Sequence, residues 1–119
     1  MASRHLHNYL RTYRKKSAFS QREVAYLLGT RSDTKISRHE CFARVPSLRT
    51  VFIYEVIYRV PARDLFVGVF ERAHHETLKR VECLRQHLQN RPSDPVTTHK
   101  IKSLTSILTQ SRASAHKAP

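Results

Sequence analysis

The sequence is short of glycine, cysteine and acidic residues, and each shortage argues against a class of protein. Only two Gly occur among 119 residues, which disfavours glycine-rich phosphate loops and β-sandwiches with many tight turns. Two Cys make no disulfide framework and suit a reducing compartment. No apolar run approaches the ~20 residues that span a bilayer, and no secretory signal is visible, so we expect a cytoplasmic protein.

Positive charge is what the chain has in excess. Lys and Arg number 22 against 9 Asp and Glu, which gives a formal net charge of +13. The surplus is spread over the whole chain, which favours a folded surface that binds phosphates over a merely solvated one. RNA binding is an alternative, but aromatic residues make up only 8% of the chain and lie mostly at core-like positions, which argues against base stacking.

Apolar side chains recur at helical spacing along most of the chain, so we expect an all-α fold. The expected helices cover residues 6–17, 20–28, 33–43, 48–58, 62–66, 69–90 and 97–110. A Pro-rich linker at 92–95 separates the last two. The organisation that follows is a domain at 1–67, a helical extension at 68–110 and a disordered tail at 111–119.

Side chains with capping roles mark several helix ends. Ser20 and Glu23 have the spacing of a capping box, and Gly29 stands where a helix needs a left-handed terminator. Ser47 is expected to cap the fourth helix. Glu55 lies inside that apolar helix, so its carboxylate must find a donor or face solvent.

One segment has a more specific pattern. It is Ser-Gln-x-x-Val-Ala-x-x-Leu-Gly from Ser20 to Gly29, followed by Ile36-Ser37-x-x-Glu40. This pattern resembles the helix-turn-helix of the Xre/Cro-repressor-like DNA-binding family, and the match extends over residues 6–66. The resemblance implies a five-helix repressor-like bundle in a prokaryotic, nucleoid-associated transcriptional regulator that binds double-stranded DNA sequence-specifically without a cofactor, and a repressor more often than an activator.

The resemblance also implies roles for individual residues. The first helix of the pair crosses the DNA backbone, and the second, at 33–43, enters the major groove. Gln21 matches the family residue that meets a phosphate and supports the reading helix. Asp33 would repel phosphate, so we expect it, or Ser32, to cap the reading helix. The base-reading candidates are Thr34, Lys35, Ser37 and Arg38, and the phosphate clamps are Arg22, Arg31 and Arg44.

Arg14 and Glu40 match two family positions that pair across the bundle, so we expect an ion pair between them. The sequence also departs from the family pattern. The turn from Gly29 to Ile36 is one residue longer than usual, so the reading helix is expected to start later or to sit differently. Cys41-Phe42 stands where the family often has Asn-Gly, so the end of that helix is also expected to differ.

The eight His and two Cys show none of the paired spacings of a zinc site, and Cys41 has no identifiable catalytic base. We therefore expect neither a metal nor an enzyme. Single His residues on basic faces are expected to be solvated or to lie near phosphate.

The apolar stripes of the helices at 69–90 and 97–110 must cover the bundle, pack together or meet a second chain. We favour a homodimer, because two-fold symmetry doubles the DNA site. The alternative function is a protein–protein module, such as an antitoxin or a bridging coactivator, with a protein partner bound through residues 69–110.

Overall fold

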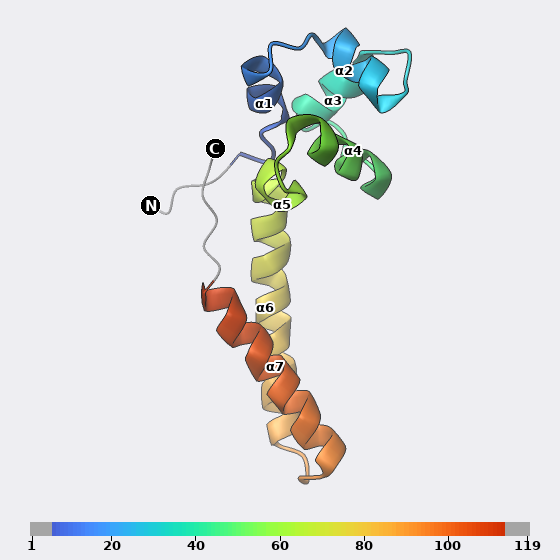
Figure 1. Cartoon of the computed structure of the whole chain (residues 1–119). Coiled ribbons are helices and arrows are strands. Elements are labelled where there is room, and N and C mark those ends of the chain that lie inside the picture. The colour runs from blue at the N-terminus through green and yellow to red at the C-terminus, as the bar shows by residue number, and fades with distance from the viewer. Residues whose placement is uncertain (1–5, 114–119) are drawn as a thin grey trace. The chain divides into compact units, whose positions relative to one another are not determined.

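The computed structural model describes residues 6–113, and within them the chain forms seven helices and no strand (Figure 1). The all-α class expected from the sequence is confirmed. The chain divides into two compact units, of which the first ends at Phe70 and the second begins at Glu71. Among the described helices, none combines the length and the hydropathy needed to cross a bilayer.

The first unit contains five short helices and the start of a long one. They are α1 (Leu10–Lys16), α2 (Gln21–Leu28), α3 (Thr34–Glu40), α4 (Leu48–Tyr58), α5 (Ala62–Leu65) and the first turn of α6 (Val67–Gln89). The helix expected at 6–17 begins later, at Leu10, because the Asn8 side chain accepts a hydrogen bond from the Leu10 N–H at 3.1 Å.

Several capping predictions are confirmed. Ser20 and Glu23 form a complete capping box, with the Glu23 N–H donating to Ser20 Oγ at 3.0 Å and the Ser20 N–H donating to Glu23 Oε1 at 2.8 Å. Gly29 ends α2 with φ of 80°. Ser47 Oγ accepts from the Thr50 N–H, which fixes the start of α4.

Glu55 was expected to find a hydrogen-bond donor or to face solvent, and the structure gives it a donor. Its Oε2 accepts a hydrogen bond of 2.6 Å from the backbone N–H of Ala62, the first residue of α5. The carboxylate thereby satisfies one of the free amides at the start of a four-residue helix and ties α4 to α5.

One hydrophobic core joins these helices. Leu10 of α1, Val24 of α2, Ile36 of α3, Tyr54 of α4 and Leu65 of α5 are each 0% exposed. Because every helix of the first unit from α1 to α5 places one of these side chains in the same cluster, the cluster fixes the helices relative to one another.

The segment before α1 lies against the start of α6. The Gly68 N–H donates to Leu6 O at 3.0 Å, and the Tyr9 N–H donates to Leu65 O at 2.8 Å. A Cβ atom at Gly68 would lie 2.7 Å from the Cα of His7, so a glycine is needed for this approach.

The second unit contains the remainder of α6 and α7 (Pro95–Ala113), with Val81, Leu88 and Thr97 buried. Asp94 caps α7 by accepting from the Thr97 N–H at 2.7 Å, and Pro95 suits the first helical position. The expectation that the disordered tail begins at 111 is wrong for residues 111–113, which continue α7. The rest of that tail, 114–119, lies outside the described residues.

Candidate nucleic-acid interface

The helix that was expected to read DNA has one buried face and one exposed face. Ile36, His39 and Glu40 are buried, and their spacing of three and four residues places them on one side of α3. The opposite side is polar and exposed. It consists of all four base-reading candidates, Thr34, Lys35, Ser37 and Arg38.

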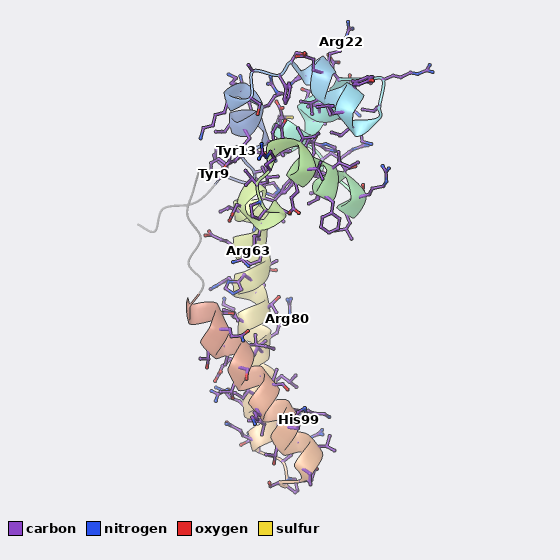
Figure 2. All side chains as sticks on the ribbon, in the orientation of Figure 1. Tyr9, Tyr13, Arg22, Arg63, Arg80 and His99 are labelled. Atoms are coloured by element: carbon purple, nitrogen blue, oxygen red, sulfur yellow. The ribbon has the colours of Figure 1, made fainter. Side chains whose placement is uncertain are left out.

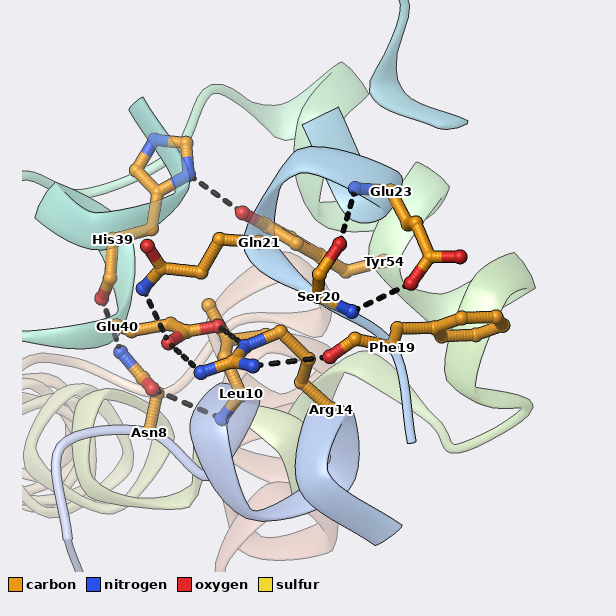
Figure 3. A network of polar contacts seen from close by, with 10 residues as sticks. All are labelled: Asn8, Leu10, Arg14, Phe19, Ser20, Gln21, Glu23, His39, Glu40 and Tyr54. Atoms are coloured by element: carbon orange, nitrogen blue, oxygen red, sulfur yellow. Dashed lines mark hydrogen bonds and ion pairs between the residues drawn. The ribbon is translucent and has the colours of Figure 1, made fainter. Parts of the chain in front are cut away.

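The predicted ion pair between Arg14 and Glu40 is confirmed (Figure 3). Arg14 Nε lies 2.6 Å from Glu40 Oε2, and Arg14 Nη2 donates to Glu40 Oε1 at 3.1 Å, so the contact is bidentate. Arg14 Nη1 also donates to the backbone oxygen of Phe19 at 3.0 Å. The hydrogen bonds to Glu40 raise the pKa of Arg14. One guanidinium therefore holds α1, the turn before α2 and the end of α3 together.

Gln21 contributes to the same network. Its amide Nε2 donates to Glu40 Oε1 at 3.2 Å, so the first residue of α2 supports the last residue of α3. This contact agrees with the supporting half of the role that the resemblance implies for Gln21. The contact with a phosphate stays a prediction.

His39 is buried, so the expectation that single histidines on basic faces are solvated or lie near phosphate does not hold for this residue. Its side chain is 1% exposed, and its Nδ1 lies 2.8 Å from the hydroxyl oxygen of Tyr54 on α4. Burial lowers the pKa of His39, and the nearby cations Lys35 and Arg44 lower it further. At neutral pH the imidazole is therefore uncharged, which suits a position inside the bundle.

Asn8 is a second residue that the sequence did not single out. Its Nδ2 donates to the backbone oxygen of His39 at 2.9 Å, while its Oδ1 accepts from the N–H of Leu10, the first residue of α1. A signal for His39 was present, because it follows Ile36 by three residues and belongs to the same helical face. No local sequence pattern predicts the role of Asn8, because its hydrogen-bond partner, His39, lies 31 residues away.

The start of α3 differs from the expectation. The helix begins at Thr34 rather than residue 33, and Asp33 makes no capping hydrogen bond with its side chain. Ser32 Oγ accepts instead from the Thr34 N–H, at 3.2 Å. Of the two candidate caps, the hydroxyl therefore satisfies the amide, and the exposed carboxylate of Asp33 stays beside the start of the helix.

The helix also ends earlier than residue 43. Its last residue is Glu40, and Phe42 adopts a left-handed conformation with φ of 68°. The Ala43 N–H donates back to the Arg38 carbonyl at 3.0 Å, as in a glycine-terminated helix. The Phe42 ring lies 5.5 Å from the His7 ring, so this residue adds a contact that glycine would lack.

Exposed cations belong to α2 and to the segments directly before and after α3. The phosphate-clamp candidates Arg22, Arg31 and Arg44 are all exposed, and Figure 2 shows the Arg22 side chain projecting from α2. Within the part of the chain that the structure describes, neither these residues nor Lys35 and Arg38 form an ion pair. Their charges are therefore available to an external anion.

A hollow of about 220 Å³ lies beside the Arg14–Glu40 pair. It is lined by Arg11, Arg14, Gln21, Ser37, Glu40 and Cys41. Arg11 is exposed, so α1 adds to this hollow a cation that was not among the expected DNA contacts.

Among residues 6–113, no group of three or more His, Cys, Asp or Glu residues is arranged to hold a metal ion. Cys41 and Cys83 are free thiols on the surface. A scan against protein-family models found no match, and searches of the curated proteins and of the solved structures found none either. The function must therefore be inferred from the residues and their geometry.

Proposed function

We propose that this chain is a sequence-specific regulator of transcription that binds double-stranded DNA with α3 in the major groove. The observation that carries the proposal is the division of α3 into two faces. Ile36, His39 and Glu40 are held inward by core packing and by partners from α1, α2 and α4. A helix fixed in this way presents its outer side chains in one orientation, as recognition of base edges requires.

The exposed residues suit the two kinds of contact that such a helix makes. Arg38 has the fork of donors that pairs with the O6 and N7 atoms of guanine, and Thr34, Lys35 and Ser37 offer further polar groups. The surrounding arginines suit phosphates, which position a protein on DNA without reading its sequence. They are Arg11, Arg22, Arg31 and Arg44.

Repression is the simplest mode of action for this arrangement, because a small domain that occupies a promoter blocks it without further machinery. The proposal is a binding function rather than a catalytic one. It needs no cofactor, since the donors that would contact DNA are all side chains of the chain itself.

A homodimer assembled through the second unit would complete the DNA site. Leu84 of α6 and Ile107 of α7 are 47% and 42% exposed, so this two-helix unit leaves apolar side chains uncovered. A second copy would cover them in the manner of a four-helix bundle. The same exposed side chains keep the alternative of a different protein partner, as in an antitoxin, open to test.

The decisive experiment is in vitro selection of duplex DNA bound by the full chain, followed by affinity measurements with the selected duplex, a scrambled duplex and an RNA duplex of the same sequence. We expect a consensus with two-fold symmetry and at least about 1000-fold tighter binding of the selected duplex than of the scrambled one. Equal affinity for all duplexes would contradict specific reading. Preference for the RNA would contradict the choice of nucleic acid.

A further inference from the structure

Helix α4 has an apolar outer face in addition to its buried face. Leu48, Phe52 and Val56 follow one another at intervals of four residues and are 70%, 53% and 77% exposed. We call these three residues the α4 stripe. Residues so spaced lie along one side of a helix, and a surface helix ordinarily carries polar side chains there.

The α4 stripe is not needed to hold the helix in the bundle. The opposite face supplies that contact through Thr50, Tyr54 and Tyr58, which are at most 8% exposed. Tyr54 and Tyr58 are stacked with their ring centroids 6.1 Å apart. The fold therefore does not depend on the outer apolar side chains. An exposed apolar surface of this kind is typical of a site that binds another molecule.

An exposed arginine lies toward each end of α4. Arg49 follows Leu48 directly and is exposed, and Arg59, just after the end of the helix, is exposed as well. The only carboxylate of α4 belongs to Glu55, whose Oε2 is hydrogen-bonded to the Ala62 N–H. A partner that covers the α4 stripe therefore meets arginines at its edges.

We propose that the α4 stripe docks an amphipathic helix of another protein, with carboxylates flanking the apolar face of that helix. The α4 stripe supplies anchors for side chains spaced by three and four residues, and Arg49 and Arg59 pair with the flanking carboxylates. The α4 stripe shares no residue with the face of α3 that is proposed to read DNA.

Two properties disfavour a second copy of this chain as the occupant. A symmetric α4–α4 contact would bring Arg49 and Arg59 near the same residues of the other copy, and like charges held together are destabilising. In addition, one stripe on an 11-residue helix offers less surface than the roughly 800 Å² per partner of a standard stable interface. A single docked helix fits that smaller area.

The proposal is tested with the full chain and three fluorescein-labelled helical peptides of equal length. The first has leucines spaced to match the α4 stripe and Glu on both flanks, the second has Lys in place of Glu, and the third is the first in scrambled order. In fluorescence anisotropy we expect the Glu peptide to bind about tenfold more tightly than the other two, which corresponds to about 1.4 kcal/mol. The Lys peptide loses the ion pairs with Arg49 and Arg59, and the scrambled peptide loses the spacing of its leucines.

Variants of the chain separate apolar docking from attraction of a basic protein for any acidic peptide. Phe52→Ser and Val56→Ser are expected to weaken binding of the Glu peptide about tenfold or more. Val96→Ser, at an exposed apolar residue of the second unit that is not among those proposed to meet a second copy, is the matched control and should leave binding unchanged. Arg49→Glu should weaken the Glu peptide and strengthen the Lys peptide.

Three results would overturn the proposal. One is equal binding of the Glu peptide and its scrambled form, and another is binding unaffected by Phe52→Ser and Val56→Ser in chains whose circular dichroism is unchanged. The third is self-association that both serine variants abolish, which would make a second copy the occupant. None of these results bears on DNA binding, because the peptide measurements contain no DNA.

Discussion

Arg14 on α1 and Glu40 at the end of α3 form a bidentate ion pair across 26 residues of sequence, with side chains only 14% and 4% exposed. Charges in such a position lose most of their hydration, and the attraction between them repays that cost only when the geometry is good. The additional bonds from Gln21 to Glu40 and from Arg14 to the Phe19 carbonyl complete the geometry. The pair therefore orients α3 more than it stabilises the bundle.

Breaking this pair from one side should be costly. In Glu40→Gln, the Arg14 guanidinium stays largely buried and loses its countercharge. We expect the free energy of unfolding, measured with urea, to fall by about 3 kcal/mol. The matched control is Glu82→Gln in the more exposed Arg85–Glu82 pair, for which a much smaller loss is expected because solvent screens the two charges.

The double variant Arg14→Met/Glu40→Gln tests whether the loss of stability comes from leaving one buried charge without its partner. Removing both charges should recover part of the lost stability, because no buried charge is left unpaired. Equal losses in Glu40→Gln and Glu82→Gln would mean that the Arg14–Glu40 pair behaves as a surface pair.

Gly29 and Ala18 both adopt a left-handed backbone conformation, and substitutions at these two residues should change the free energy of unfolding in opposite directions. Gly29 has φ of 80°, and a Cβ atom added there would meet no atom within 4 Å, so Gly29→Ala introduces no clash but strains the backbone. We expect a loss of about 1 kcal/mol. Ala18, exposed in the turn between α1 and α2, has φ of 63°, so Ala18→Gly should instead raise the free energy of unfolding by up to about 1 kcal/mol. Thermal unfolding that shifts in the same direction for both variants would contradict this reasoning.

The parts of the fold that local chemistry specifies were predictable from the sequence. The capping box of Ser20 and Glu23, the Gly29 terminator and the Ser47 cap depend on residues within four positions of one another. The Arg14–Glu40 pair was predictable only through the family resemblance, because no local rule joins residues so far apart. Asn8 escaped prediction for the same reason, since its partner is a distant backbone carbonyl.

The boundaries of α3 were less predictable than its existence. Ser32 and Asp33 are both good capping residues, and only the backbone conformation decides that the Ser32 hydroxyl reaches the Thr34 amide. At the other end, Phe42 adopts a conformation that its side chain disfavours. The Ala43 N–H turns back to the Arg38 carbonyl, so the helix stops before the residues that its pattern included.

Acid should weaken the first unit through His39. The pKa of His39 is lowered below its ordinary value of 6.5 because the side chain is buried near Lys35 and Arg44. The unfolded chain therefore binds a proton more readily than the folded one. The stability that the neutral imidazole provides is complete above pH 6.5 and is lost as the pH falls below that value.

Urea unfolding between about pH 7.5 and pH 5 measures this effect. His39→Gln should flatten the pH dependence, because an amide keeps a polar atom near Tyr54 and does not titrate in this range. The matched control is His75→Gln, on the exposed surface of α6, which should retain the slope of the parent chain. A slope that is the same in all three chains would assign the pH dependence to other groups.

The proposed dimer predicts a change in mass when the exposed apolar side chains of the second unit are made polar. Leu84→Gln and Ile107→Gln should shift the chain from dimer toward monomer in sedimentation equilibrium, since each removes apolar surface that a second copy would bury. Thr77→Gln, at an exposed position of α6, is the control and should leave the dimer intact. A parent chain that is monomeric at about 100 μM, well above the micromolar Kd of a specific interface, would remove the dimer from the proposal.

Arg38 and Arg22 should affect DNA binding in different ways. Arg38→Ala removes a side chain from the face of α3 that is proposed to read bases, so we expect a loss of about 1–3 kcal/mol of discrimination at one base pair of the selected site. Arg22→Ala removes a cation on α2 that is proposed to contact a phosphate. It should weaken binding to every duplex alike and reduce the slope of log affinity against log salt by about one. Lys79→Ala, at an exposed position on α6, is the control for loss of charge alone. Identical selected sequences for the parent chain and Arg38→Ala would show that α3 does not read the bases, even if the salt dependence follows the prediction.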